Sequence, residues 1–236
     1  MTSVVARDFF RGFRAVVPLW LGLIPFSLAY AVSARGAGLS VLDTLLMSAL
    51  VFAGGSQFSA VGLLAAGASG VEIILTTLLL NTRHLLYGLS LSQRVPLRPA
   101  QRLLAAHFLT DEAYGVVLAE PRASFAYVLG VELSVFIPWN LFTLAGSLLG
   151  QGLPDPTRLG VDFVFPLAFL ALLIPLLRGS VEVGVAVLSG VLALVASRFL
   201  TGGAALLLAG VVGSLTGAWC TAGAPAARPT EELEAP

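Results

Sequence analysis

Apolar residues fill eight long stretches of this chain, and short groups of arginines, glycines and prolines separate them. A helix that spans a membrane needs about 20 mostly apolar residues. Lipid offers no hydrogen bonds to the backbone, and the runs lack the alternation of barrel strands, so the pattern predicts spanning helices. The predicted segments are residues 15–34, 42–67, 71–92, 100–119, 123–150, 162–178, 180–198 and 202–223. The predicted fold class is an all-α integral membrane protein, a polytopic helical bundle that forms a single transmembrane domain over residues 1–236.

The two ends of the chain depart from this pattern. In residues 1–14, Arg7, Arg11 and Arg14 are spaced i, i+4, i+7, which places them on one face of a helix and two phenylalanines on another. Such a helix is expected to lie in the membrane interface ahead of the first span. Residues 224–236 are predicted to form a short polar tail.

Segment 42–67 is interrupted by "AGGSQ" at residues 53–57, where paired glycines weaken a helix. It is either one long span or a broken helix that enters and leaves on the same side. A single crossing places six loop arginines on each side of the membrane, whereas a re-entrant segment places eight inside and four outside. Cytoplasmic loops carry an excess of arginine, so the count favours seven spans plus a re-entrant or broken helix. The amino terminus is then cytoplasmic and the tail "EELEAP" external.

Composition agrees with a membrane protein and excludes several other classes. The 236 residues are 57% hydrophobic and only 11% charged, with a mean hydropathy of +0.94, far from the usual range of soluble domains. Thirteen basic residues balance thirteen acidic ones, so charge gives no argument for binding nucleic acid. The single cysteine, Cys220, excludes an intramolecular disulfide and a cysteine cluster for a metal. No cofactor or metal is expected.

Polar residues inside the segments are the candidates for function. "NTRHLLYG" places Asn81, Arg83 and His84 near the membrane midplane, where an arginine costs about 2.5 to 3.5 kcal/mol and is usually paired and functional. Asp111 and Glu112 of "AHFLTDEAYG" fall at a matching depth in segment 100–119. At about 100° per residue, Thr77, Asn81, His84 and Gly88 share one face, and Thr76, Arg83, Tyr87 and Ser90 share roughly the opposite face.

Each candidate has a structural alternative. Arg83 and one carboxylate either line a substrate path or only neutralise each other between two helices. His107 and Asp111, four residues apart, would be neighbours in a continuous helix, although "TDEA" would also cap a helix that restarts after Thr110.

The remaining polar candidates are open in the same way. "FAGGSQFSA" at 52–60 either exposes backbone groups that bind a ligand or packs tightly through its small residues. Trp139, beside Pro138, either walls an apolar pocket or packs at a kink, which is the simpler interpretation.

Three motifs together resemble a known family. "FAGGSQFSA", "NTRHLLYGLSLS" and "HFLTDEAYGV", in this order and spacing, are similar to the AzlC-type branched-chain amino-acid permeases, and the resemblance covers roughly residues 10–220. Thr82 departs from the leucine or alanine common in that family. The resemblance implies the large subunit of a two-component exporter of leucine, isoleucine and valine in the cell membrane, with a small AzlD-type membrane subunit as its partner.

A zwitterionic substrate needs groups for its carboxylate, its ammonium group and its side chain. The hypothesis assigns substrate binding to Gly54, Gly55, Ser56, Gln57, Asn81, Arg83, Asp111 and Trp139. No nucleotide-binding P-loop motif occurs in the sequence, so a proton gradient is the expected driving force. Glu112, His84 and His107 are the candidate proton carriers.

Three rival hypotheses remain. An intramembrane enzyme would use Ser56 as nucleophile with His84 or His107 as base. A haem-bearing electron carrier would use the two histidines as axial ligands. A passive channel would use the same polar residues as a carrier does.

Overall fold

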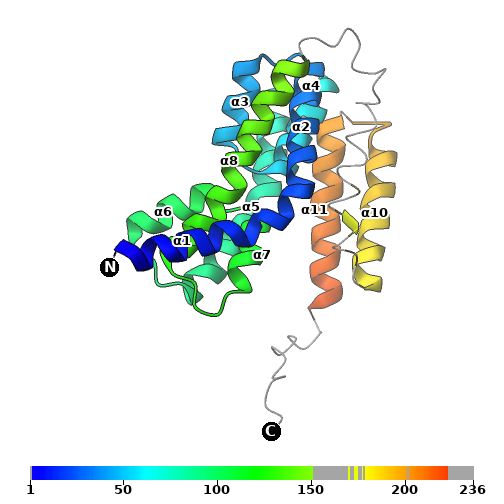
Figure 1. The fold of residues 1–236 in the computed structure, drawn as a ribbon. Helices are drawn as coiled ribbons and strands as arrows, with labels where there is room; N and C mark the ends of the chain where they lie inside the picture. Colours follow the sequence, from blue (N-terminus) through cyan, green and yellow to red (C-terminus); the bar gives the residue numbers. More distant parts are fainter. Residues whose placement is uncertain are drawn as a thin grey trace. The chain divides into compact units, whose positions relative to one another are not determined.

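The computed structural model describes residues 2–150, 170, 173–174, 177, 179–200 and 202–222, and every regular element in those ranges is a helix (Figure 1). The predicted tail at 224–236 lies outside the described residues, and so does nearly all of the predicted segment at 162–178. The elements are α1 (Thr2–Val16), the 3₁₀ helix η1 (Val17–Leu19), α2 (Trp20–Gly36), α3 (Val41–Leu50), α4 (Gly54–Ala65), α5 (Gly70–Arg94), α6 (Pro99–Phe108), α7 (Asp111–Leu118), α8 (Phe125–Gly150), α10 (Ser180–Ala196) and α11 (Gly202–Thr221).

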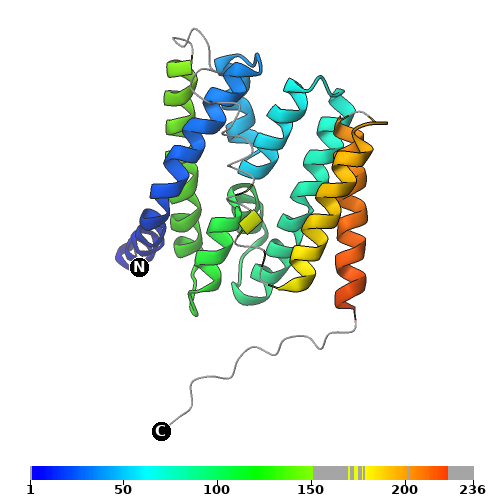
Figure 2. The same ribbon diagram turned by 90° about the vertical axis from the view of Figure 1, so that its right-hand side faces the viewer.

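The chain divides into two units, residues Met1–Leu172 and Leu173–Pro236. In the second unit, α10 and α11 run side by side in both views (Figures 1 and 2). Gly213 and Gly217 of α11 face Ser189 and Val185 of α10, so small residues allow the two helices to approach closely.

Helix α8 is the centre of the first unit, with α1 and α2 packed along it (Figure 1). A side chain at Gly12 would meet the backbone of Tyr127, and one at Gly130 would meet the backbone of Phe9. Gly146 likewise faces Leu28 and Ala31 of α2. Close helix packing through glycines is typical of membrane bundles, where lipid removes the hydrophobic drive for association.

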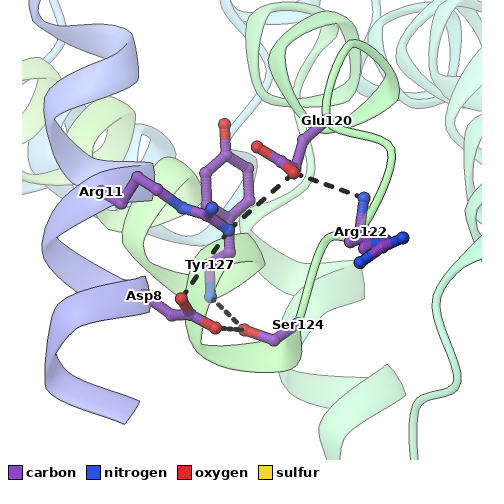
Figure 3. Close-up of polar contacts among 6 residues, drawn as sticks. All are labelled: Asp8, Arg11, Glu120, Arg122, Ser124 and Tyr127. Atoms are coloured by element: carbon purple, nitrogen blue, oxygen red, sulfur yellow. Dashed lines mark hydrogen bonds and ion pairs between the residues drawn. The ribbon is translucent and has the colours of Figure 1, made fainter. Parts of the chain in front are cut away.

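A polar cluster fixes α1 to the connection between α7 and α8 (Figure 3). Ser124 donates a hydrogen bond to Asp8 at 2.8 Å, and the Arg11 guanidinium lies 3.9 Å from the Glu120 carboxylate. The same guanidinium lies 5.1 Å above the Tyr127 ring. Arg7, Arg11 and Arg14 are all exposed, and Arg11 also contacts this cluster. The interfacial position of this helix stays a prediction.

Segment 42–67 is two helices, as the glycine pair predicted. Helix α3 ends at Leu50 and α4 begins at Gly54. Ser40 and Asp43 form a capping box at the start of α3. At the other end of α4, Gly67 has a φ of 74° and the Ala68 N–H bonds the Leu63 carbonyl, which closes the helix in a left-handed turn.

Segment 100–119 is also broken, as the alternative of a helix restarting after Thr110 allowed. Helix α6 ends at Phe108, and α7 restarts at Asp111 with Thr110 as its N-cap, whose hydroxyl accepts a hydrogen bond from the Ala113 N–H at 3.3 Å. The restart after Thr110 is confirmed. The expected i, i+4 pairing of His107 and Asp111 is wrong, because no continuous helix joins them.

Three helices in the described parts are long and apolar enough to cross a membrane: Val4–Gly36, Phe125–Leu149 and Ala204–Thr221. Val41–Leu50 and Ser180–Ala196 are shorter apolar helices. The predicted count of about seven spans is therefore not confirmed. The break at 109–110 divides one of the expected spans into two short helices, whereas the break at 51–53 lies in the segment that was expected to be broken.

Candidate functional site

The two broken segments meet at one small cavity in the first unit. The cavity has a volume of about 30 Å³, enough for a few water molecules. Its walls come from α2, both helix breaks, α5 and α8. They comprise Leu23, Phe26, Phe52, Ala53, Gly54, Gly55, Arg83, His84, Thr110, Asp111, Glu112, Val135 and Trp139.

An ion pair joins α5 to the start of α7 at this cavity. Arg83 Nη1 lies 3.0 Å from Asp111 Oδ2, and the two side chains are 33% and 35% exposed. Tyr87 donates a hydrogen bond from its hydroxyl to the other carboxylate oxygen, Asp111 Oδ1, at 2.7 Å. Both Asp111 oxygens are thus engaged, and the predicted contact between Arg83 and a carboxylate is confirmed.

The helix face that carries Arg83 also carries the other contacts to α7. Tyr87 and Tyr114 stack with ring centroids 4.4 Å apart. Tyr114 donates a hydrogen bond to the Ser90 hydroxyl at 3.0 Å. The grouping of Arg83, Tyr87 and Ser90 on one face, derived from helical periodicity, agrees with these contacts.

The start of α4 lines the cavity with Gly54 and Gly55. Its first intrahelical hydrogen bond runs from the Gln57 N–H to the Ala53 carbonyl at 2.9 Å. The N–H groups of Gly54, Gly55 and Ser56 therefore precede the hydrogen-bonded ladder, and Ala53 offers no side-chain cap. Uncapped amides at the positive end of a helix dipole suit a carboxylate ligand.

Trp139 of α8 forms the apolar wall opposite these amides. Its ring stacks on the Tyr30 ring with centroids 6.2 Å apart and lies 6.3 Å from that of Phe26. A Cβ atom at Gly54 would lie 3.1 Å from Trp139 Cη2. Trp139 both lines the cavity and packs against neighbouring aromatic rings beside Pro138, so it fits both interpretations. Its indole Nε1 is buried with no hydrogen-bond partner among the described residues.

Two of the candidate proton carriers also line the cavity. Glu112 follows Asp111 in the first turn of α7, and His84 follows Arg83 along α5. The His84 ring packs edge-on against Tyr87 with centroids 5.8 Å apart. Its Nε2 is buried and has no hydrogen-bond partner in the part of the chain that the structure describes.

Four predicted residues do not line this cavity. Ser56 donates a hydrogen bond to Asn81 Oδ1 at 2.6 Å, which joins α4 to α5 and gives the serine an amide partner rather than a histidine. The Gln57 side-chain amide lies 3.3 Å from three carbonyls at the end of α3. His107 is exposed, and its ring contacts Phe108 and Phe136.

Two residues of interest were absent from the predicted set. Thr110 was recognised as a cap but also lines the cavity. Glu132 of α8 is wholly buried, and neither carboxylate oxygen has a hydrogen-bond partner within the described ranges. A single acidic residue in the apolar run "VLGVELSVFIPW" was the available signal. No group of three or more histidine, cysteine or acidic side chains in the described residues is arranged to hold a metal.

Apolar helices, two of them broken where they meet a charged cavity, define a helical membrane protein. The chain belongs to the AzlC family, whose model, described as "AzlC protein", matches residues 18–153. That match includes every residue of the cavity.

Named relatives agree with this assignment. The chain is 31% identical over 179 residues to the inner membrane protein YgaZ of Escherichia coli (strain K12), covering 72% of this chain and 73% of that one. It is 30% identical over 213 residues to a membrane protein of Archaeoglobus fulgidus, covering 89% and 94%. The branched-chain amino acid transport protein AzlC of Bacillus subtilis (strain 168) is 24% identical over 176 residues, covering 73% and 69%. No solved structure matches the chain.

Proposed function

We propose that this protein is the transporting subunit of an exporter of branched-chain or similar small amino acids in the cell membrane. The similarity to the branched-chain amino acid transport protein AzlC of Bacillus subtilis supports the substrate class. The observation that carries the proposal is the joining, at one cavity, of the α4 amino terminus, the Arg83–Asp111 pair and the Trp139 ring. These three elements match the carboxylate, ammonium group and apolar side chain of an amino acid.

In the proposed complex, the substrate carboxylate accepts hydrogen bonds from the Gly54 and Gly55 amides and from Arg83. Asp111 binds the substrate ammonium group. Its carboxylate already accepts from Arg83 and Tyr87, but each oxygen has a further lone pair that can accept from the ammonium group. Phe26, Phe52 and Trp139 surround the substrate side chain. The site is held in place by hydrogen bonds between helices: Ser56 of α4 bonds Asn81 of α5, and Gln57 of α4 bonds the end of α3.

The cavity of about 30 Å³ is smaller than an amino acid, so the structure corresponds to a closed state of the proposed site. Binding then requires α4 and α7, which begin at the two helix breaks, to move away from α5 and α8. Half-length helices at a binding site, able to shift as units, are typical of secondary transporters.

For the energy source we retain the proton gradient, with Glu112, His84 and His107 as the proposed carriers. Glu112 and His84 are the stronger candidates because both line the cavity. We also propose a small AzlD-type membrane subunit as the partner and a cytoplasmic amino terminus. To test the orientation, a cysteine is introduced near the amino terminus of a Cys220→Ser variant. A cytoplasmic amino terminus predicts that a membrane-impermeant thiol reagent does not label it in intact cells.

The test is efflux of preloaded labelled leucine, isoleucine and valine from cells that lack their own exporters. The chain is expressed alone, with an AzlD-type subunit, and as Arg83→Ala with that subunit. We expect efflux in the paired sample and its loss in Arg83→Ala. Arg94→Ala is the matched control, because Arg94 is an exposed arginine at the end of the same helix. Equal efflux from all samples and from empty cells, despite confirmed membrane expression, would contradict the proposed substrate class.

A further inference from the structure

Glu132 is the one wholly buried acidic side chain among the described residues. It lies in α8, its exposed fraction is 0%, and neither carboxylate oxygen has a hydrogen-bond partner in the described ranges. A carboxylate that is ionised and unpaired in apolar surroundings is costly. The charge must therefore be neutralised by a cation or by a proton.

A second cavity adjoins Glu132, separate from the one at Arg83. It has a volume of about 150 Å³, and its walls come from the end of α5, from α6 and from α8. Leu91, Val95, Ala105, Leu109 and Val128 form most of the lining. Ser92 and Arg102 are its other polar side chains, and the space is sufficient for several water molecules.

The ionisable groups on the neighbouring helices have other partners, line the other cavity or are exposed, as Arg7, Arg14, Arg94 and Arg98 are. On α6, the Arg102 Nε donates to the Leu97 carbonyl at 3.0 Å, and His107 contacts aromatic rings. On α5 and α7, Arg83 and Tyr87 bind Asp111, Tyr114 binds Ser90, and His84 and Glu112 line the first cavity. On α1, Arg11 pairs with Asp8 and Glu120. On α2 and α3, Tyr30 donates to the Thr44 carbonyl, Arg35 to the Leu39 carbonyl, and Asp43 accepts from Ser40.

Because Glu132 is wholly buried, a proton is the group that can neutralise its carboxylate without displacing the helices. With no accessible surface on its side chain, an ammonium group or hydrated cation cannot touch the carboxyl from the cavity without movement of the helices. A proton needs no such space. A protonated carboxyl is also neutral, so it suits the apolar residues Val128, Val131 and Val135 on the same helix.

We propose that Glu132 binds and releases a proton during the transport cycle, and that the proton reaches it through the cavity lined by α5, α6 and α8. In the conformation seen here the carboxyl holds a proton. When α6 moves and water in the cavity reaches the side chain, the O–H bond breaks and the proton passes to water, leaving a carboxylate. A proton from water on the other side of the membrane restores the neutral acid. This inference rests on the proposed transport function.

The test uses the full chain, with its small subunit if efflux requires one, reconstituted in vesicles. Two activities are compared: exchange of labelled for unlabelled leucine at equal pH, and net transport driven by a pH gradient. For Glu132→Gln, a neutral isostere of the protonated acid, we expect exchange within about twofold of the wild type and net transport reduced at least about tenfold, as for a lost proton relay. Glu182→Gln, at an exposed acid in the first turn of α10, is the matched control and should change neither activity.

Each outcome has a separate meaning. No leucine exchange by the wild type contradicts the proposed function. Normal exchange with normal gradient-driven transport in Glu132→Gln overturns the inference and leaves Glu132 as a constantly neutral core residue. Loss of net transport in Glu112→Gln but not in Glu132→Gln likewise overturns it and assigns the proton to the first cavity. If Glu132→Gln does not fold, Glu132→Asp decides: a displaced pH profile of net transport supports the inference, and an unchanged profile overturns it.

Discussion

The indole Nε1 of Trp20, at the start of α2, donates a hydrogen bond to the carbonyl oxygen of Ser134 in α8 at 2.8 Å. Four residues further along α8 lies Pro138, which has no N–H to give to that carbonyl. The tryptophan therefore supplies the donor that proline removes from the helix. This contact joins α2 to α8 one turn before Trp139, the apolar wall of the candidate site.

Replacing Trp20 by phenylalanine should leave the Ser134 carbonyl without a donor. We expect the free energy of unfolding to fall by about 1 to 3 kcal/mol. In a Pro138→Ala background the helix provides its own donor, so the same replacement should cost less. Denaturant unfolding in detergent measures both values, and equal costs in the two backgrounds would contradict this account. Trp219→Phe, at a tryptophan that is 83% exposed in α11, is the control.

Variants of the Arg83–Asp111 pair should affect the stability of the protein and its transport activity differently. Asp111→Asn leaves the arginine without its counter-charge, and we expect a loss of about 1 to 3 kcal/mol, since the pair is only partly exposed. The double variant Arg83→Met with Asp111→Asn carries no unpaired charge and should regain part of that stability. Leucine efflux should stay absent in both variants. Recovery of efflux in the neutral double variant would show that the pair is structural.

Helix periodicity and residue type predicted much of this site, for identifiable reasons. The faces of α5 followed from rotation per residue, and the cost of charge in a membrane indicated that Arg83 needs a carboxylate. Both depend on local geometry. The pairing of His107 with Asp111 failed because it assumed an unbroken helix, whereas Thr110 competes for the backbone and restarts it.

Contacts between residues far apart in the chain could not be predicted from the sequence. Nothing local indicates that Trp20 faces Ser134 or that Ser56 meets Asn81. Each depends on which faces of distant helices pack together. Gln57 illustrates the limit, because its amide was predicted to bind substrate and instead bonds the end of α3.

Gln57 should act as a cap for α3 across the helix break. Its Nε2 lies 3.3 Å from the carbonyls of Met47, Ser48 and Val51 at the end of α3. The Met47 carbonyl also accepts from the Val51 N–H, whereas the carbonyls of Ser48 and Val51 lie where a helix runs out of backbone donors. Gln57→Glu replaces the donor by an acceptor at the negative end of the helix dipole, so we expect a loss of about 1 to 3 kcal/mol. The measurement is thermal unfolding in detergent.

Gln101→Glu is the matched control for this cap. Gln101 accepts a hydrogen bond from the Arg98 N–H at the start of α6, at 2.9 Å, so a carboxylate there keeps the acceptor at the positive end of a dipole. The same chemical change should therefore be neutral or slightly stabilising. Equal destabilisation at Gln57 and Gln101 would indicate that the loss at Gln57 does not arise from capping.

The spacing between Gly54 and Trp139 should control the size of the candidate site. A methyl group at residue 54 would lie 3.1 Å from Trp139 Cη2, closer than ordinary contact, so Gly54→Ala must displace the indole and Gly54→Leu must fill the cavity. We expect efflux to fall several-fold in the first variant and at least about tenfold in the second, because small displacements at a binding site are costly. Gly115→Ala in α7 is the control, since nothing lies within 4 Å of its added methyl group.

The Gly54→Ala and Gly54→Leu variants also test the position of the substrate side chain. If Trp139 contacts that side chain, efflux of the small substrates glycine and alanine should decrease less than efflux of leucine, because a smaller side chain tolerates a narrower space. An equal decrease for all substrates would place the damage in the packing of α4 against α8 rather than in the binding site.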